Sequence, residues 1–174
     1  FELDFDHLES ILNKNTKVVS IVGESNISGM LPDIKKINSL VKDKTDAVYI
    51  VDGAQLVPHR KIDVQDLGID FLCVSGHKML GPTGIGVVWG RKELLENLDP
   101  VYGGGDMIEE VFYDTATWAP IPHKFEAGTP PYVEAIGLGA AVDYLSNLDM
   151  NNVQKHSDAV SYTHLTLPTN PEGG

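Results

Sequence analysis

Short apolar runs alternate with helical patterns along the first hundred residues of the chain. Runs of four to six mostly apolar residues, rich in Val and Ile, predict buried strands. They lie at residues 17–22, 47–51, 71–74 and 85–89. Apolar residues spaced three and four positions apart predict helices. These lie at residues 6–12, 33–41 and 91–98, with a short helical turn at 63–67. Strands that alternate with helices in this way indicate an α/β fold, with a mostly parallel sheet and flanking helices.

The second part of the chain is patterned differently. Residues 98–130 are rich in Gly and Pro and show no regular period, which predicts a long functional loop. Residues 131–148 predict a helix, and residues 151–159 predict the start of another. Residues 160–174 do not continue that pattern and resemble a translated sequencing-adapter read-through. We therefore divide the chain into a native domain fragment, residues 1–159, and a non-native tail, residues 160–174.

Composition narrows the function classes. The 174 residues are 42% hydrophobic, which suffices for one domain with a core. The net charge of −12 disfavours binding to nucleic acid. No apolar run is long enough to span a membrane, and no signal-peptide pattern opens the chain.

The single cysteine fits a reducing, cytoplasmic setting, and the six histidines show no metal-ligand spacing. Because the chain starts at Phe1, we expect it to be a piece of a longer protein.

Polar side chains follow three successive predicted strands. They are Ser25 and Asn26 after the first strand, residues 52–55 after the second, and residues 75–78 after the third. The carboxyl ends of parallel strands meet at one edge of a sheet, where ligands of α/β proteins bind. The sequence therefore predicts a ligand site at this edge.

Lys78 is the candidate nucleophile of that site. A lysine amine forms a Schiff base with carbonyl compounds, and pyridoxal 5'-phosphate (PLP) is a cofactor held in this way. Ser75 and His77 could donate hydrogen bonds to its phosphate. The residues leave a second interpretation open, a Gly-rich turn with an exposed lysine. The Gly-x-x-x-x-Gly-Lys-Ser/Thr order of a nucleotide-binding loop is absent from the sequence.

Asp52 is the second candidate. A carboxylate near a pyridine nitrogen keeps that nitrogen protonated and strengthens PLP as an electron sink. Asn26 and Gln55 could bond the ring oxygen of the cofactor, and Ala54 is small enough to lie beneath the ring. The alternative for Asp52 is a turn or helix-cap residue, as an Asp-Gly pair usually is.

Several segments resemble one enzyme family. They are Val51-Asp52-Gly53-Ala54-Gln55, Ser75-Gly76-His77-Lys78, residues 81–86, residues 103–108 and residues 125–130. The chain is similar to the class V aminotransferase family of PLP enzymes, and within it to SufS-type cysteine desulfurases, over about residues 1–159. The resemblance implies a partial large domain of a fold-type I PLP-dependent enzyme. One departure is Gly23, where the family commonly has a histidine.

The resemblance also implies roles for the candidate residues. Lys78 would be the Schiff-base lysine, and Asp52 would pair with the pyridine nitrogen. Asn26 and Gln55 would contact the ring oxygen, and Ser75 and His77 the phosphate. Gly128 and Thr129 would reach the phosphate of the neighbouring subunit's cofactor, which implies a homodimer.

The activity that the resemblance implies is conversion of L-cysteine to L-alanine, with the sulfur passed on as a persulfide for iron–sulfur cluster assembly. A sulfur-acceptor protein would be the partner. Cys73 lies in the middle of a predicted strand. We therefore interpret it as a small, unreactive apolar residue and not as the sulfur-accepting thiol. The alternatives are a selenocysteine lyase, a kynureninase-like hydrolase, another aminotransferase, or a non-catalytic fragment that at most binds cofactor.

Overall fold

A four-stranded sheet forms the centre of the molecule. The computed structural model describes residues 3–166, with side chains described as far as residue 160. The strands are β1 (Val18–Val22), β2 (Val48–Asp52), β3 (Phe71–Ser75) and β4 (Gly86–Gly90), in that spatial order. β1, β2 and β3 are parallel, and β4 runs antiparallel to β3. The predicted α/β fold and mostly parallel sheet are confirmed.

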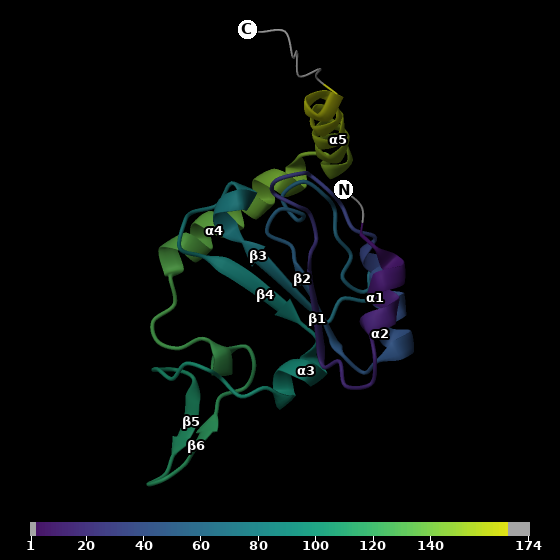
Figure 1. Cartoon of the computed structure of the whole chain (residues 1–174). Coiled ribbons are helices and arrows are strands. Elements are labelled where there is room, and N and C mark those ends of the chain that lie inside the picture. Colours follow the sequence, from purple (N-terminus) through teal and green to yellow (C-terminus); the bar gives the residue numbers. More distant parts are fainter. Residues whose placement is uncertain (1–2, 167–174) are drawn as a thin grey trace, which may run out of the picture.

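Two helices cover one face of this sheet. They are α1 (Phe5–Ile11) and α2 (Ile34–Lys44), and both lie on the same side of the strands (Figure 1). α2 begins where the Asp33 side chain accepts a hydrogen bond from the Lys36 N–H, and its apolar face is fully enclosed at Ile37 and Val41. That face packs with Tyr49 and other residues of the sheet into one core cluster.

The region predicted as a long loop contains regular structure, so that prediction is wrong in part. After α3 (Lys92–Asn97), the strands β5 (Ile108–Val111) and β6 (Ala116–Trp118) form an antiparallel hairpin, and η2 (His123–Phe125) follows. The hairpin projects away from the central sheet (Figure 1). Its strands have four and three residues and are largely exposed, so they carry no apolar alternation that a sequence pattern could register.

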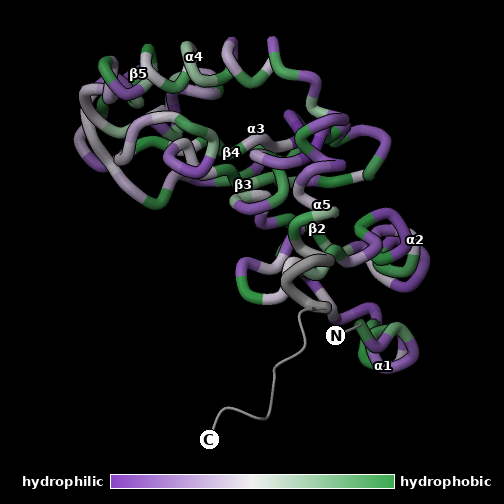
Figure 2. Tube along the Cα trace, turned by 90° about the horizontal axis from the view of Figure 1, so that it is seen from above, coloured by the Kyte–Doolittle hydropathy of each residue, from purple (hydrophilic) through white to green (hydrophobic). Residues whose placement is uncertain are grey.

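The final described elements are α4 (Tyr132–Asn147) and α5 (Met150–Thr166). Viewed from above, α4 lies on the side of the strands opposite to α1 and α2 (Figure 2). The prediction that the helical pattern stops at residue 160 is wrong, because α5 continues to Thr166. Residues 167–174 lie outside the described part, and the assignment of residues 160–174 to a non-native tail stays a prediction.

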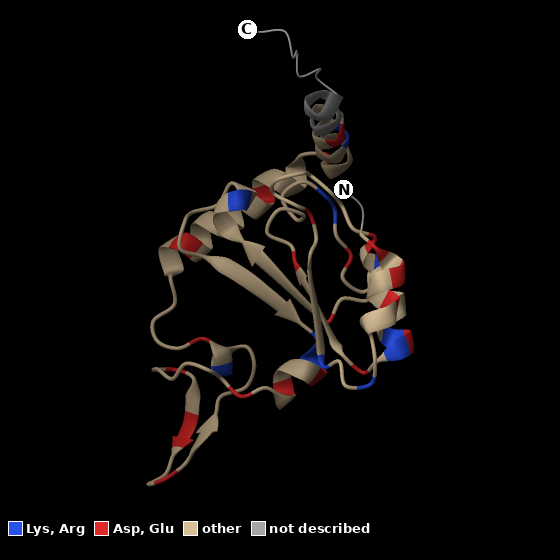
Figure 3. Ribbon diagram, in the orientation of Figure 1, with Lys and Arg blue, Asp and Glu red and all other residues tan. Residues whose placement is uncertain are grey.

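Charged side chains are spread over the surface rather than gathered on one element. Figure 3 shows Asp and Glu on the helices and on the hairpin, with Lys and Arg scattered between them. Within the described residues, no helix is both long and apolar enough to cross a membrane.

Candidate active site at the strand ends

The register of the parallel strands brings three polar segments to one edge of the sheet. Val22 pairs with Asp52, and Asp52 pairs with Cys73, two residues before β3 ends at Ser75. The segments that begin after β1, β2 and β3 therefore leave the sheet side by side. This is the placement predicted from the sequence for Asn26, for residues 52–55 and for residues 75–78.

Lys78 lies on a single 3-10 turn, η1 (Gly76–Met79), directly after β3. Its side chain is half-buried. In the part of the chain that the structure describes, no carboxylate pairs with the Lys78 amine, and no hydrogen bond occupies it. Ser75 and His77 lie beside it, with Ser75 Oγ and His77 Nδ1 3.0 Å apart. An amine without a partner, next to two hydrogen-bonding side chains, is suited to hold a carbonyl compound that also carries an anionic group.

Close packing fixes the shape of η1. A Cβ on Gly76 would lie 2.8 Å from the carbonyl oxygen of Ile85, and a Cβ on Gly81 would lie 2.9 Å from the carbonyl oxygen of Gly76. Leu80 between them has a left-handed φ of 62°. α4 packs against the same loop, because a Cβ on Gly81 would also lie 2.9 Å from Leu138 Cδ1. The turn that carries Lys78 is therefore held from both sides.

Asp52 ends β2 and faces solvent. Its Oδ1 accepts a hydrogen bond of 2.9 Å from the backbone N–H of Ala54. This is the turn bond that the alternative interpretation expected, and it holds the carboxylate in one orientation. No described residue donates a hydrogen bond to Oδ2. The second oxygen is therefore available to a cation or to a protonated ring nitrogen, so the turn role and the ligand role are compatible.

The loop after β1 presents Asn26 to solvent. Ser25 organises this loop, because its Oγ accepts hydrogen bonds from the N–H groups of Ile27 and Ser28, at 3.3 and 3.2 Å. Gln55 is half-buried in the turn after β2, and its carbonyl oxygen lies 2.8 Å from His59 Nδ1. Ala54 is half-buried between Asp52 and Gln55.

Gly128 and Thr129 are not brought to this edge. They lie in the segment between η2 and α4, where the Gly128 N–H donates a 2.9 Å hydrogen bond to the carbonyl oxygen of Gly105. Gly128 has a φ of 83°, a conformation that favours glycine. Among the described residues, no hydrogen bond links either of them to Lys78, Asp52 or His77.

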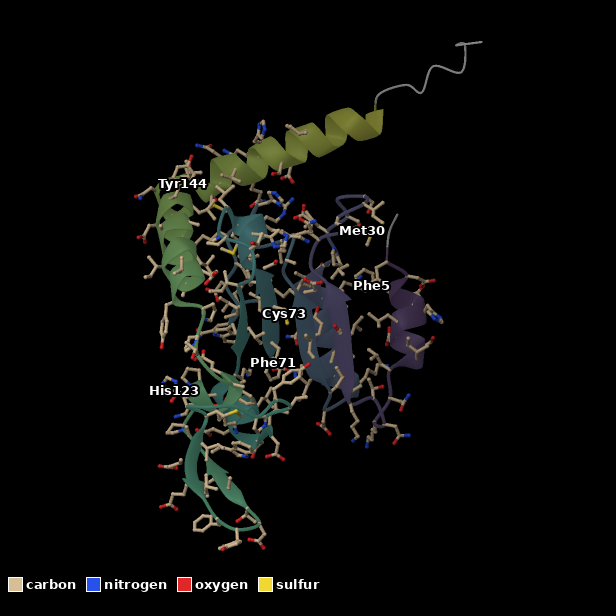
Figure 4. The ribbon with its side chains drawn as sticks, turned by 90° about the vertical axis from the view of Figure 1, so that its left-hand side faces the viewer. Phe5, Met30, Phe71, Cys73, His123 and Tyr144 are labelled. Atoms are coloured by element: carbon tan, nitrogen blue, oxygen red, sulfur yellow. The ribbon has the colours of Figure 1, made fainter. Side chains whose placement is uncertain are left out.

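Cys73 lies in β3 near the centre of the sheet (Figure 4). Its side chain lines a hollow on the sheet face opposite to α1 and α2. Burial raises the pKa of its thiol, and the negative charge of Asp52 raises it further. A thiol that ionises with difficulty is a poor nucleophile, so the interpretation of Cys73 as an inert strand residue agrees with its surroundings.

One group of charged residues near this edge was not predicted from the sequence. Glu24, Arg60 and Asp158 form a chain of ion pairs, and His59 lies beside it. Glu24 directly precedes the Ser25-Asn26 pair, and this charged residue next to a strand-end cluster was the one available signal. The other members are far from it in sequence, so no spacing rule could have grouped them.

The donor set at the strand ends fits PLP. The amine matches the aldehyde of PLP, and the carboxylate with one open oxygen matches its pyridine nitrogen. The hydroxyl–imidazole pair matches its phosphate. Lys78, Asp52, Ser75 and His77 would supply these groups, and Asn26 and Gln55 lie on the same edge. In the described residues, no group of three or more His, Cys, Asp or Glu side chains could hold a metal ion.

The family model described as aminotransferase class-V matches residues 1–170. The chain belongs to the class V aminotransferase family. Among relatives of this class V chain, a probable cysteine desulfurase of Streptomyces coelicolor is 48% identical over 159 residues. These residues make up 91% of the chain and 38% of that relative.

Solved structures show the same relationship for this class V aminotransferase chain. The cysteine desulfurase CsdA from Escherichia coli superposes with a TM-score of 0.83 at 42% identity, covering 88% of the chain and 38% of CsdA. A cysteine desulfurase from Thermococcus onnurineus gives a TM-score of 0.82 at 35% identity, with the same two coverages of 88% and 38%. The chain thus spans about two fifths of the length of the proteins it matches, with 38% coverage in each of these cases.

Proposed function

We propose that the chain is the cofactor-binding part of a PLP-dependent cysteine desulfurase. The observation that carries this proposal is the unpaired amine of Lys78 beside the Ser75–His77 pair, on the same sheet edge as Asp52. Relatives and structural neighbours named cysteine desulfurases support it. The net reaction transfers the sulfur of L-cysteine to an acceptor thiol as a persulfide and releases L-alanine, so all atoms are accounted for.

Lys78 has two tasks in this proposal. Its amine would hold the cofactor through the aldehyde group and would move the proton on Cα of the substrate. When bound, PLP would supply the electron sink for this proton removal. η1 suits the first task, because a short, closely packed turn holds the amine in place while the absence of an ion pair leaves it free to react.

Asp52 supports the chemistry electrostatically. Oδ1 is engaged by the Ala54 N–H, which directs the carboxylate, and Oδ2 is left to hold a proton on the pyridine nitrogen. Ser75 and His77 bind the phosphate in this scheme. Asn26 and Gln55 would donate their amide N–H groups to the ring oxygen, and Ala54 would leave room for the ring.

The sulfur acceptor requires a thiolate. Cys73 is the one cysteine of the 174 residues, and it is half-buried in β3 with a raised thiol pKa. We therefore assign the accepting thiol to a cysteine outside these residues. From that thiol the sulfur passes to an acceptor protein for iron–sulfur cluster assembly, in the cytoplasm, as in the SufS-type enzymes that the chain resembles.

A homodimer is part of the proposal. Gly128 and Thr129 lie away from Lys78 within the chain, which leaves them to serve the site of a second copy. The left-handed φ of 83° at Gly128 directs the backbone into a tight turn before α4. The Gly128 N–H is engaged by the Gly105 carbonyl oxygen, so the phosphate would be bound by the N–H and hydroxyl groups of Thr129.

The test is a lysine replacement in the full-length enzyme. Lys78→Ala should abolish the visible absorption band that PLP acquires on a lysine, together with release of alanine from cysteine. Lys92→Ala removes an exposed amine of α3 and is the matched control, which should keep both. Borohydride reduction followed by peptide mapping should place the phosphopyridoxyl label on Lys78. A label on another lysine would refute the assignment.

A further inference from the structure

Arg60 connects two acidic side chains that come from distant parts of the chain. Its Nε lies 3.4 Å from Glu24 Oε2, and its Nη2 pairs with Asp158 Oδ1. The side chains of Glu24 and Arg60 are each 12% exposed, so this ion pair is largely shielded from water. We call the three residues Glu24, Arg60 and Asp158 the Arg60 bridge.

The Arg60 bridge joins three elements. Glu24 belongs to the segment between β1 and the loop that carries Asn26. Arg60 closes the turn after β2, where its N–H donates a 3.1 Å hydrogen bond to the carbonyl oxygen of Leu56. Asp158 lies on α5. The guanidinium thus ties the segment after β1 to the segment after β2, and Asp158 links α5 to both.

His59 extends the bridge to Gln55. The distance from His59 Nδ1 to the Gln55 carbonyl oxygen is 2.8 Å, and because a carbonyl oxygen can only accept, Nδ1 must carry the hydrogen. Glu24 Oε1 lies 3.9 Å from the same nitrogen. The carboxylate of Glu24 is therefore placed between the loop of Asn26 and the turn of Gln55.

We infer that the Arg60 bridge positions Asn26 and Gln55, with Arg60 as the positioning residue. This inference rests on the proposed function, in which these two amides contact the ring oxygen of PLP. An ion pair with little exposure holds its partners in one arrangement because neither charge can turn to water without losing the other. Without Arg60, the Glu24 carboxylate must move toward solvent, and the loop of Asn26 moves with it.

The chain offers a matched ion pair at the opposite edge of the sheet. Asp70, whose side chain is 5% exposed, precedes β3 and pairs with Arg91 Nε at 3.0 Å and with Lys42 Nζ at 2.6 Å. Arg91 therefore partners a shielded carboxylate, as Arg60 does, but at the edge of the sheet away from Lys78. Replacing Arg91 removes one of the two cations beside a shielded carboxylate without reaching the ligand site.

The experiment compares Arg60→Met, Arg60→Lys and Arg91→Met in the full-length enzyme. Arg60→Met should weaken the apparent PLP affinity by about tenfold, the lower end of the loss caused at metal sites by residues that only orient the ligands. It should also shift the pH midpoint of the visible band. Amide donors to the ring oxygen change the proton affinity of the neighbouring Lys78 nitrogen that is bonded to the cofactor. Arg60→Lys keeps the charge beside Glu24 and should restore most of the affinity. Arg91→Met should lower the melting temperature and leave affinity and pH midpoint unchanged.

A double variant covers the case in which Arg60→Met fails to fold. Glu24→Gln with Arg60→Met leaves no shielded charge unpaired, because the remaining carboxylate, Asp158, is 52% exposed and can be solvated. This variant should therefore fold and still show the weaker affinity and the shifted midpoint. Unchanged affinity and midpoint in folded Arg60 variants, with a band in the wild type, would overturn this inference alone. A wild-type enzyme with no visible band after PLP addition would overturn the proposed function and this inference together.

Discussion

Asp52 and Cys73 are the last register pair between β2 and β3. Burial is the main cause of the raised pKa of the Cys73 thiol, and the charge of Asp52 is the second. The candidate catalytic carboxylate and the one cysteine of the sequence are therefore electrostatically coupled. Cys73 can serve as a chemical reporter of the charge on Asp52, independently of any turnover.

The first prediction uses this coupling. Asp52→Asn removes a negative charge that disfavours the thiolate, so the pKa of Cys73 should fall toward its ordinary value. The thiolate is the species that reacts with iodoacetamide, and a lower pKa means that alkylation begins at lower pH. Peptide mapping of Cys73 after alkylation across a pH series measures the midpoint. Because burial remains, the midpoint should still lie above that of a free cysteine. An unchanged or raised midpoint would contradict the coupling.

The second prediction concerns catalysis by the full-length enzyme. Asp52→Asn leaves a neutral partner for the pyridine nitrogen and preserves the side-chain shape. The barrier should rise by about 3 kcal/mol, roughly a hundredfold in kcat. PLP affinity should change much less, since the phosphate and the Lys78 bond remain. Alanine formation under saturating cysteine, together with PLP titration, separates the two effects. Near-normal turnover would remove Asp52 from the mechanism.

The sheet and its ligand edge could be predicted from the sequence because both depend on local signals. β-branched runs such as Val18–Val22 favour strands, and polar residues directly after them mark the strand ends. The prediction that this strand is buried is wrong, because Val18 is 56% exposed and Val22 is 49% exposed. The β5–β6 hairpin could not be predicted, because residues such as Glu110 and Val111 are exposed on short strands. Pairing of that kind depends on the turn, which is closed by the bond from the Phe112 N–H to the carbonyl oxygen of Thr115.

The Arg60 bridge lies beyond sequence reasoning for a different reason. Glu24, Arg60 and Asp158 belong to separate elements, and charged residues on predicted loops are expected in solvent. Glu24 and Arg60 are nevertheless only 12% exposed, while Asp158 is 52% exposed, and contacts between such distant segments depend on tertiary structure alone. The proximity of Ser75 and His77, in contrast, could be predicted from the sequence, because residues two apart at the end of a strand remain close in space.

The third prediction addresses that pair. Ser75 Oγ and His77 Nδ1 share a hydrogen bond of 3.0 Å and are both proposed to bind the phosphate. Ser75→Ala and His77→Ala should each weaken PLP binding, and the double variant should lose less than the sum. Residues in contact commonly couple by about 0.5–3 kcal/mol. Spectroscopic PLP titration of the four proteins in the cycle measures this coupling. Strict additivity would show that the two residues act independently.

The fourth prediction compares two glycines. A Cβ on Gly81 would lie 2.9 Å from a backbone oxygen of η1 and 2.9 Å from Leu138, whereas a Cβ on Gly139 would meet nothing within 4 Å. Gly81→Ala should therefore destabilise the full-length enzyme by about 1–3 kcal/mol through overpacking and disturb the Lys78 turn. Gly139→Ala should be neutral or stabilising by up to about 1 kcal/mol, because alanine favours the helix. Thermal unfolding measures both. Equal stability of the two variants would contradict this packing.

The last prediction concerns the sheet face that α1 and α2 do not cover. A hollow of about 420 Å³ lies there, and its lining is almost entirely apolar. Its lining residues are Val18, Val48, Ile50, Phe71, Cys73, Val88, Leu94, Asn97 and Leu98. An apolar surface of this kind binds hydrophobic dyes and promotes association. The 174-residue chain expressed alone should therefore bind such a dye strongly or aggregate, and it should form no alanine from cysteine even with added PLP.

Two neighbouring residues of β4 locate the dye site. Val88 pairs with Cys73 and lines the hollow, whereas Val87 pairs with Val74, which packs against the core on the other face. Successive strand residues point to opposite faces, so Val88→Ser should reduce dye fluorescence of the isolated chain and Val87→Ser should not. Fluorescence titration of both variants, each measured on the monomeric fraction, makes the comparison. Weak dye binding by the unmodified chain, a sharp thermal transition and measurable alanine formation would show that this face is not an open apolar surface.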